Sequence, residues 1–416
     1  MDGRVLQVNV SPGGVPKLPV ERAWVGPLGL EGDRQKHDTV HGGPHRAVAL
    51  LAIEAIERVQ ADGHPIEPGS VGENLTTSGI ELATLAPGTR LAIGERLILE
   101  ISWPANPCDL IVGSFRDGKS GRISILTHPS DSRMYARALV EGEVRPGDEI
   151  RVMPPEDPEA AARQILLERI DAVTLDSEVA LWRTAADAGV SIDVEEHGEL
   201  AMASSAELRS SAFNRALGHR MLPNLTDRML AFYERAGRPG WIVADRSPWP
   251  GAEAESRSIV FVADPASVAS ADPTDPDVTV REIEPGEADA WSRVLVEAST
   301  IDGPERRAWI EATRRQVGTG GHHRLIAEQA GEPIGVAGLF TRRRVGLLAT
   351  TAVLPAARGR GIQRALIAAR VRLAIERRCN VVTASALVDS PSARNLERMG
   401  FRPIHEQALY RFDPAG

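Results

Sequence analysis

The residues best suited to chemistry lie in one segment, Gly346–Arg377, which joins an apolar run, a basic loop and a helical pattern. The apolar, β-branched run ends at Pro355, and apolar residues recur at helical spacing from Ile362 onwards. Glycines let a backbone approach an anion closely, the first N–H groups of a helix lack partners, and arginines add positive charge. The loop contains Arg358, Gly359, Arg360, Gly361, Ile362 and Gln363. The segment therefore predicts a binding site for a pyrophosphate.

Two other interpretations of this loop stay open. It can be a basic surface loop between a strand and a helix, or it can contact nucleic acid. The chain has a net charge of −9 and only 4% aromatic residues. Nucleic-acid-binding proteins instead present basic surfaces, often interleaved with aromatic residues. We therefore expect no nucleic-acid partner.

Several elements must surround the loop to position it. Two strands, His323–Gln329 and Pro333–Phe340, precede it and are joined by a turn at Gly331-Glu332. A strand at Val381–Leu387 and a helix at Ser392–Met399 follow it. This order of elements predicts a mixed sheet with helices packed on it.

The loop resembles the acyl-CoA-binding motif of the Gcn5-related N-acetyltransferases (GNAT), whose pattern is Gln/Arg-x-x-Gly-x-Gly/Ala. Arg358 and Gly361 match this pattern, and Gln363 replaces the last small residue. The resemblance covers roughly Val278–Phe412. It implies an α+β fold with a mixed central sheet, acetyl-CoA as the acyl donor and a small-molecule amine as the acceptor. The residues that it implies for acetyl-CoA are Ala352, Val353, Leu354, Arg358, Gly359, Arg360, Gly361, Ile362, Gln363 and Asn395.

The acid and base for such a transfer are less clearly marked. Many GNAT enzymes carry a tyrosine general acid in the helix after the loop, where Leu396 stands here. Tyr410 is the candidate replacement acid, although a structural strand tyrosine is the alternative. Glu328 is the candidate base, with Asp389 and His405 as further candidates that the sequence does not rank.

A second set of chemical groups lies in the first 155 residues, in polar loops between apolar runs. These loops contain Gly32-Asp33, His41–Arg46, Gly72-Glu73-Asn74 and Pro107-Cys108. A soft thiolate beside histidines and arginines suits molybdenum, copper(I), zinc or iron, rather than magnesium or calcium. The spacing does not fit a structural zinc site, which needs closely paired ligands. Cys108 as a buried small apolar residue remains an alternative.

Together these loops resemble a MOSC domain, the molybdenum cofactor sulfurase C-terminal region, over Gly3 to about Val152. The resemblance implies a β-barrel-rich fold and a molybdenum cofactor (molybdopterin). It implies that Cys108 ligates the metal. The residues implied around the pterin and its phosphate are His41, Arg46, Glu73 and Asn74. Asp109 stands where many relatives have a basic or aromatic residue, and it favours a barrel that serves only as a scaffold.

Linker-like compositions divide the chain. Residues 153–158 and 263–277 are rich in proline and acidic residues. They predict three parts: 1–155 as a MOSC domain, 156–277 as a helical or degenerate GNAT-like region, and 278–416 as a GNAT domain. In the middle part we expect helices at 160–170, 177–188, 206–217 and 224–235, and strands at 241–244 and 258–263. Phe213–Gly218 resembles a segment of tandem GNAT proteins with a degenerate first half, and a plain helical spacer is the alternative.

The overall composition fits a soluble cytoplasmic protein. The only cysteines are Cys108 and Cys379, which argues against a disulfide framework and for a reducing compartment. No apolar stretch approaches the roughly 20 residues that span a membrane, and the N-terminus lacks the apolar core of a signal peptide. We therefore expect no membrane partner.

Two hypotheses on function follow. In the first, the chain is bifunctional. The MOSC domain reduces N-hydroxylated compounds with an external electron donor, or transfers sulfur, and the GNAT domain acetylates an amine. In the second, the chain is a cofactor-binding or sulfur-handling protein whose GNAT part senses acyl-CoA without catalysis.

Overall fold

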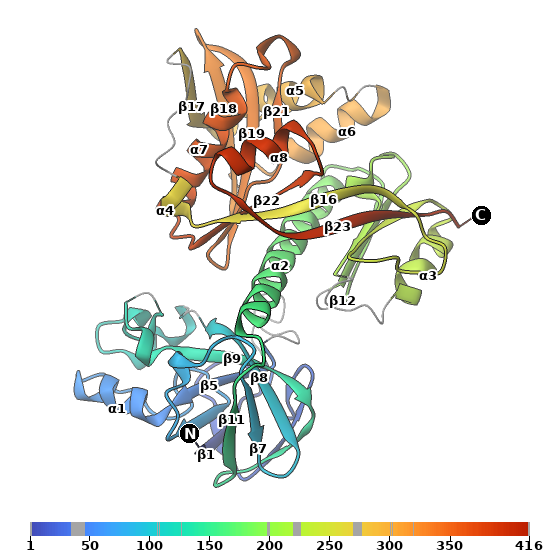
Figure 1. Cartoon of the computed structure of the whole chain (residues 1–416). Coiled ribbons are helices and arrows are strands. Elements are labelled where there is room, and N and C mark those ends of the chain that lie inside the picture. The colour runs from blue at the N-terminus through green and yellow to red at the C-terminus, as the bar shows by residue number, and fades with distance from the viewer. Residues whose placement is uncertain are drawn as a thin grey trace. The chain divides into compact units, whose positions relative to one another are not determined.

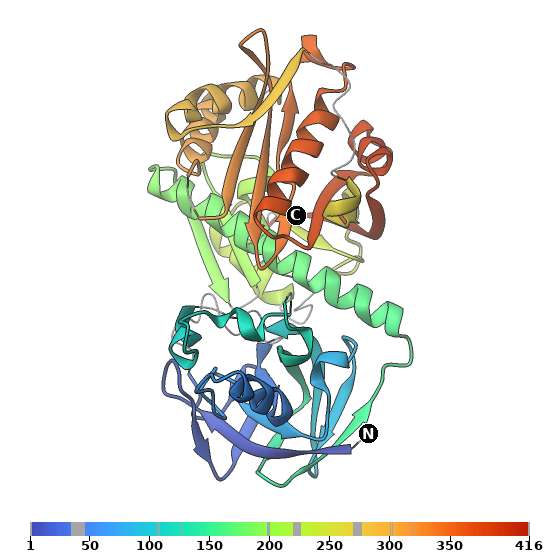
Figure 2. The ribbon, with the colours of Figure 1, turned by 90° about the vertical axis from the view of Figure 1, so that its left-hand side faces the viewer.

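The computed structural model describes residues 2–34, 46–105, 107, 109–125, 127–197, 200–218, 226–268, 277–299, 301, 303–318 and 320–414. The chain forms two compact units, unit 1 (Met1–Leu166) and unit 2 (Leu167–Gly416) (Figures 1 and 2). Their boundary lies inside one helix, α2 (Pro158–Asp187). The finer division into domains 1–155, 156–277 and 278–416 stays a prediction.

Unit 1 is built on a closed barrel of seven strands, as the sequence predicts. The ring runs β11-β7-β8-β9-β5-β6-β1 and closes where β1 pairs with β11, while β2 pairs with β1 outside the ring. The barrel strands are β1 (Asp2–Val10), β5 (Val48–Ala52), β6 (Leu75–Ser78), β7 (Arg90–Ile93), β8 (Leu97–Ala105), β9 (Arg133–Val140) and β11 (Glu149–Met153). The short strands β2 (Leu18–Val20), β3 (Ala23–Gly26), β4 (Gly29–Leu30) and β10 (Gly142–Val144) lie outside this ring.

The alternation of aliphatic residues with more polar ones explains why these segments form the strands of a barrel. In the hairpin β7–β8, Leu91, Ile93, Leu97 and Leu99 alternate with more exposed residues and are completely buried. Gly94 supplies the left-handed turn residue, with φ of 58°. The helix α1 (Ile53–Ala61) directly follows β5.

Unit 2 contains one large mixed sheet. Its path runs β12-β13-β14-β15-β23-β16-β22-β20-β19-β18-β17, and β21 pairs with β19 beside it. The strands are β12 (Ile192–His197), β13 (Leu200–Ser205), β14 (Arg215–Leu217), β15 (Gly240–Ala244), β16 (Ala254–Ala263), β17 (Val278–Glu282), β18 (His322–Gln329), β19 (Glu332–Arg342), β20 (Val345–Leu347), β21 (Thr351–Val353), β22 (Val381–Leu387) and β23 (Arg402–Phe412). The helices are α2, α3 (Thr226–Ala236), α4 (Pro265–Val268), α5 (Ala288–Ala298), α6 (Gly303–Arg314), α7 (Ile362–Glu376) and α8 (Pro391–Arg398).

The prediction of a mostly helical middle part is wrong. The predicted helices 160–170 and 177–188 are one helix, α2, because no glycine or proline interrupts them. Residues 206–217 form a short 3-10 turn and β14 instead of a helix. There the Asn214 side chain bonds the backbone of Ser205 and Ser210, and such local bonds compete with a helix. β13 is buried at every position, which suits a central strand.

The middle part repeats the arrangement of the C-terminal part. β14 and β15 are parallel and flank α3, just as β20 and β22 are parallel and flank α7. The two parts also exchange strands. β16 belongs to the middle part and pairs with β22, whereas β23 belongs to the C-terminal part and pairs with β15. The middle part therefore contains the same strand–helix–strand arrangement as the C-terminal part, and it is not a purely helical spacer.

Different helices cover the two faces of the C-terminal part of the sheet (Figure 1). Ile326 and Val336 point to the face where Trp291 of α5 packs. Their neighbours Leu325 and Ala337 point to the opposite face, against α7. This alternation separates the face of the sheet that α5 covers from the face that α7 covers. None of the helices in the described ranges combines membrane-spanning length with a sufficiently apolar sequence.

Candidate functional site

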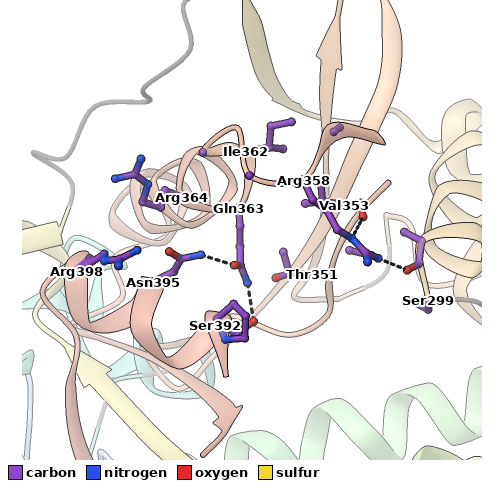
Figure 3. A pocket seen from close by; sticks show the side chains of 16 residues that line it. Ser299, Thr351, Val353, Arg358, Ile362, Gln363, Arg364, Ser392, Asn395 and Arg398 are labelled. Atoms are coloured by element: carbon purple, nitrogen blue, oxygen red, sulfur yellow. Dashed lines mark hydrogen bonds between the residues drawn. The ribbon is translucent and has the colours of Figure 1, made fainter. Parts of the chain in front are cut away.

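The predicted anion loop lines a cavity of about 740 Å³. The cavity is formed by β21, the loop, the first turn of α7, the start of α8 and the end of α5 (Figure 3). Gly359 and Gly361 have φ of 78° and 77°, a conformation that favours glycine. Gly361 is the N-cap of α7, so the N–H groups of Ile362 and Gln363 have no partner within the helix. This backbone suits an anion.

Arg358 has a different role from the one that its charge suggests. Its Nε donates to the carbonyl of Val353 at 3.1 Å, and its Nη2 donates to the carbonyl of Ala298 at 2.9 Å. The side chain therefore ties the loop to β21 and to the end of α5, as Figure 3 shows. Sequence reasoning missed two other arginines that line the cavity, Arg364 and Arg398. Their positions, three residues after Gly361 and Asn395, were the available signal.

The predicted residues Gln363 and Asn395 contact each other. The Asn395 amide donates to Gln363 Oε1 at 2.6 Å, and the Gln363 amide donates to Ser392 Oγ at 2.8 Å (Figure 3). Gln363, which replaces the small residue of the GNAT pattern, thus joins α7 to α8. Ala352 and Val353 line the cavity, whereas the N–H of Leu354 is bonded to the carbonyl of Ile334.

A second cavity, of about 420 Å³, lies on the α5 side of the sheet. It is lined by α2, α6, β18, the segment 347–350 and parts of β16, β22 and β23. Ala349 and Thr350 line this cavity, and Thr351 and Val353 line the first. The two cavities therefore meet along one strand, where β20 ends and β21 begins. Thr350 has φ of 29° there, a strained value for a threonine.

The second cavity holds buried polar groups. Arg324 and His322, alternate residues of β18, are each 6% exposed. Burial lowers the pKa of His322 to about 3, with Arg324 and His323 adding to the effect, so the imidazole is neutral at neutral pH. Within the described part of the chain, neither ring nitrogen of His322 has a hydrogen-bond partner. Glu178 of α2 forms an ion pair with Arg215 at 2.6 Å.

The predicted acid and base lie elsewhere. Tyr410 packs under α3 with its ring 6.4 Å from that of Trp249, and it lines neither cavity. Glu328 forms an ion pair with Arg281 at 2.8 Å, and it also lines neither cavity. His405 contacts Asp245 at 2.8 Å. The structure therefore does not bring Tyr410 and Glu328 together with the loop.

In unit 1, two of the predicted ligands, His41 and Cys108, lie outside the described residues. Arg46 lies over the ring of Trp103, with its guanidinium 5.6 Å from the ring centroid. Among the described residues, no group of three metal-ligating side chains gathers.

Glu73 and Asn74 are buried and hold loops together. Glu73 accepts hydrogen bonds from the N–H of Gly69 and from Thr76, and burial raises its pKa. The Asn74 amide bonds the backbone of Ala49 and a carboxylate oxygen of Asp33. Asn74 and one carboxylate oxygen of Glu73 thus hold the loops, whereas Glu73 Oε2 has no hydrogen-bond partner within the described part of the chain.

Sequence reasoning also missed a buried ion pair in unit 1. Lys17 Nζ lies 2.5 Å from Asp33 Oδ2, with both side chains at most 10% exposed. Desolvation lowers the pKa of Lys17, against the opposing effect of Asp33. No local sequence pattern pairs residues that are 16 positions apart in irregular segments.

Comparison with known proteins finds matches to two domain families. Residues 37–151 match the MOSC domain, and residues 288–401 match the acetyltransferase (GNAT) family. The chain is therefore a multidomain protein with a MOSC domain and a GNAT domain.

Individual relatives match only parts of the chain. Protein YiiM of Escherichia coli (strain K12) is 34% identical over 106 residues, which are 23% of this chain and 45% of that protein. The match thus spans less than half the length of this curated relative. A GCN5-related N-acetyltransferase from Kribbella flavida is 16% identical, with a TM-score of 0.41 over 56% of this chain and 96% of that one. YiiM from Geobacillus stearothermophilus is 22% identical, with a TM-score of 0.30 over 36% of this chain and 75% of that one.

Proposed function

We propose that unit 2 transfers an acetyl group from acetyl-CoA to a small-molecule amine. The observation that carries this proposal is the meeting of the two cavities at Thr350 and Thr351. One cavity offers glycine backbone and helix N–H groups to a pyrophosphate, and the other offers a buried, polar space for an acceptor. The match to the GNAT family over residues 288–401 supports the same activity.

In this reaction the amine nitrogen attacks the thioester carbonyl. An N–C bond forms, the C–S bond breaks, the amine loses a proton and the CoA thiolate leaves and takes up a proton. The attacking amine must be neutral. The second cavity is lined by buried groups that include the neutral imidazole of His322. Removal from water disfavours the charged form of an amine, so such a cavity favours the neutral nucleophile.

Positioning is the other contribution of the chain. β21 and the loop would hold the CoA arm in one cavity, and the second cavity would hold the amine in line with the thioester. Holding two reactants in place supplies much of the acceleration of such reactions.

The test combines a binding and a turnover measurement. Calorimetry should show saturable acetyl-CoA binding, and a thiol reagent should report steady CoA release when a broad amine panel is added. Binding without CoA release from any amine would instead support a sensor of acyl-CoA, the second candidate. A specific observation favours that candidate. All three tyrosines of the chain are described, and none of them lines either cavity.

For unit 1 we propose binding of the molybdenum cofactor, with Cys108 as the metal ligand. The match of residues 37–151 to the MOSC domain supports it, because it includes Cys108, His41 and Arg46. A bound cofactor would supply the reduction of N-hydroxylated substrates, or sulfur transfer. A cytoplasmic location and an external electron donor belong to the same proposal. Glu73 and Asn74 would lie around the pterin with His41 and Arg46, and they would also hold the surrounding loops.

Elemental analysis tests this second proposal. Protein from a cofactor-competent host should contain near-stoichiometric molybdenum, which Cys108→Ala removes. Cys379→Ala, the other cysteine of the chain, is the matched control and should retain the metal. Equal metal content in the two variants, or no metal in the wild type, would reject Cys108 as a ligand.

A further inference from the structure

We infer that the acceptor of unit 2 is an amine that also carries a carboxylate, and that Arg324 binds this carboxylate. The inference rests on the proposed acetyl transfer, because only that reaction makes the bound amine an acceptor. The carboxylate site itself follows from the buried cation, its partners and its position.

Arg324 is a buried cation with weak compensation. Its Nη2 donates to Gln316 Oε1, and its guanidinium lies 5.0 Å from the ring centroid of Trp291. Within the described residues, no carboxylate lies within ion-pair distance of Arg324, and its Nε has no partner. Burial lowers its pKa only to about 10, so the group stays charged at neutral pH. A buried charge without a counter-ion is costly, so a ligand that supplies one is strongly favoured.

A second buried arginine shows what full compensation looks like. Arg370 of α7 donates to the carbonyls of Leu366, Gly338 and Ala349 at 3.0 to 3.2 Å. Three backbone acceptors satisfy this guanidinium, and it serves the fold. Arg215, which lines the second cavity, is compensated by Glu178. Arg324 lines the same cavity and has neither kind of partner.

The position of Arg324 connects it to the reacting end of the cavity. Arg324 pairs with Gly338 across β18 and β19. A Cβ at Gly338 would lie 2.7 Å from Arg324 Nη1 and 3.6 Å from the carbonyl oxygen of Ala349. The N–H of Gly338 also donates to the carbonyl of Thr350 at 2.9 Å. The guanidinium therefore lies beside residues 349 and 350, where the two cavities meet.

This position defines the chemistry of the substrate. A guanidinium binds a carboxylate with two parallel hydrogen bonds. A carboxylate held there would lie next to the junction where the amine must attack. The acceptor is therefore expected to carry its amine and its carboxylate close together, as an amino acid does.

The experiment compares matched probes on the full-length protein. Each L-amino acid is tested beside its amide and its decarboxylated amine, with acetyl-CoA as donor and CoA release as readout. The wild type should use some amino acids at least about tenfold better, in kcat/KM, than their two counterparts. Arg324→Gln should raise KM for those amino acids by about 30-fold or more, the loss expected for one partner of a buried charge pair. Arg324→Gln should change KM for the amides far less.

Two further variants separate binding from folding. Gly338→Ala adds a methyl group that displaces the end of Arg324, and it should weaken amino-acid use in the same direction. Arg257→Gln removes an exposed arginine that pairs with Glu406, and it serves as the matched control. Its KM and kcat/KM for every probe should equal those of the wild type. Acetyl-CoA affinity should be unchanged in Arg324→Gln, and its near-ultraviolet circular dichroism should show that the variant is folded. Equal use of amides by the wild type, or equal losses for all probes in Arg324→Gln, would overturn the inference.

Calorimetry distinguishes this inference from the proposed function. The same probes are titrated into protein saturated with CoA. If no amine is acetylated but amino acids bind, and Arg324→Gln abolishes that binding, the carboxylate site stands and acetyl transfer fails. If amines are acetylated but amino acids neither bind nor react better than amides, the carboxylate site fails and acetyl transfer stands.

Discussion

At the scale of the residue, the same amino acid has opposite roles depending on its partners. Arg358 and Arg370 donate to backbone carbonyls and hold elements together, whereas Arg324 has one amide partner and an aromatic ring. Charge alone thus does not identify a binding residue. The number of acceptors around each guanidinium does.

The backbone conformation of glycine in the loop gives a direct test of acetyl-CoA binding there. Gly359 and Gly331 have φ of 78° and 82°, and neither has a heavy atom within 4 Å of an added Cβ. Valine at either position therefore carries a similar backbone strain. Only Gly359 lines the first cavity. We expect Gly359→Val to weaken acetyl-CoA binding about tenfold or more, the value of one charge-assisted hydrogen bond. Gly331→Val should leave the Kd from calorimetry unchanged, and equal losses would contradict the site.

His322 predicts a pH dependence of stability. Burial, with help from Arg324 and His323, lowers its pKa to about 3, while the unfolded chain takes up a proton near pH 6.5. The unfolded state therefore binds more protons between these values, and the free energy of unfolding falls as pH drops below about 6.5. Between pH 7 and pH 5, the free energy of unfolding should fall by about 2 kcal/mol less in His322→Phe than in the wild type. Urea unfolding of both proteins at both pH values measures this difference. Equal losses of stability in the wild type and in His322→Phe would reject a neutral buried His322.

The sequence indicates the loop better than the cavity behind it. The loop is contiguous, and glycine and arginine at its positions have a direct physical meaning. The second cavity gathers α2, α6 and β18, which lie far apart in the chain. Its one local signal was that His322 and Arg324 stand at alternate positions just before the apolar run Leu325–Ala327, which places both side chains on one face of a strand.

At the scale of the element, the exchange of β16 and β23 determines what can fold alone. Phe261 and Ala263 of β16 belong to the same apolar cluster as Leu366 of α7. A fragment that begins at residue 278 lacks β16, so β22 would have an unpaired edge and this cluster would be incomplete. Sequence reasoning recognised the strand at 258–263 but not its partner, because pairing across more than a hundred residues has no local signal.

Two fragments test this exchange. Residues 167–416 should give a soluble protein with one cooperative transition, whereas residues 278–416 should aggregate or lack near-ultraviolet circular dichroism. A cooperatively folded and monomeric 278–416 would contradict the structural role of β16.

At the scale of the whole molecule, the two units have separate cores. The barrel core and the clusters of unit 2 share no residue among those described. A ligand stabilises the part that it binds in proportion to its concentration over Kd. Saturating acetyl-CoA, at about 100 times Kd, should therefore stabilise unit 2 by about 2.7 kcal/mol. Calorimetric scans of the full chain should show one transition that moves and one that stays. A shift of both together would indicate coupled unfolding.

The exchanged strands also impose an order on biosynthesis. β23 comes last, yet it pairs with β15 and β16, which were made more than a hundred residues earlier. Neither half of the sheet is complete until β23 leaves the ribosome, and contacts of such long sequence separation form slowly. Nascent chains would hold β15 and β16 with open edges during this time, when unpaired strands are prone to aggregate. Any premature stop before Arg402 would therefore disable both halves at once, including the half whose own residues were already translated.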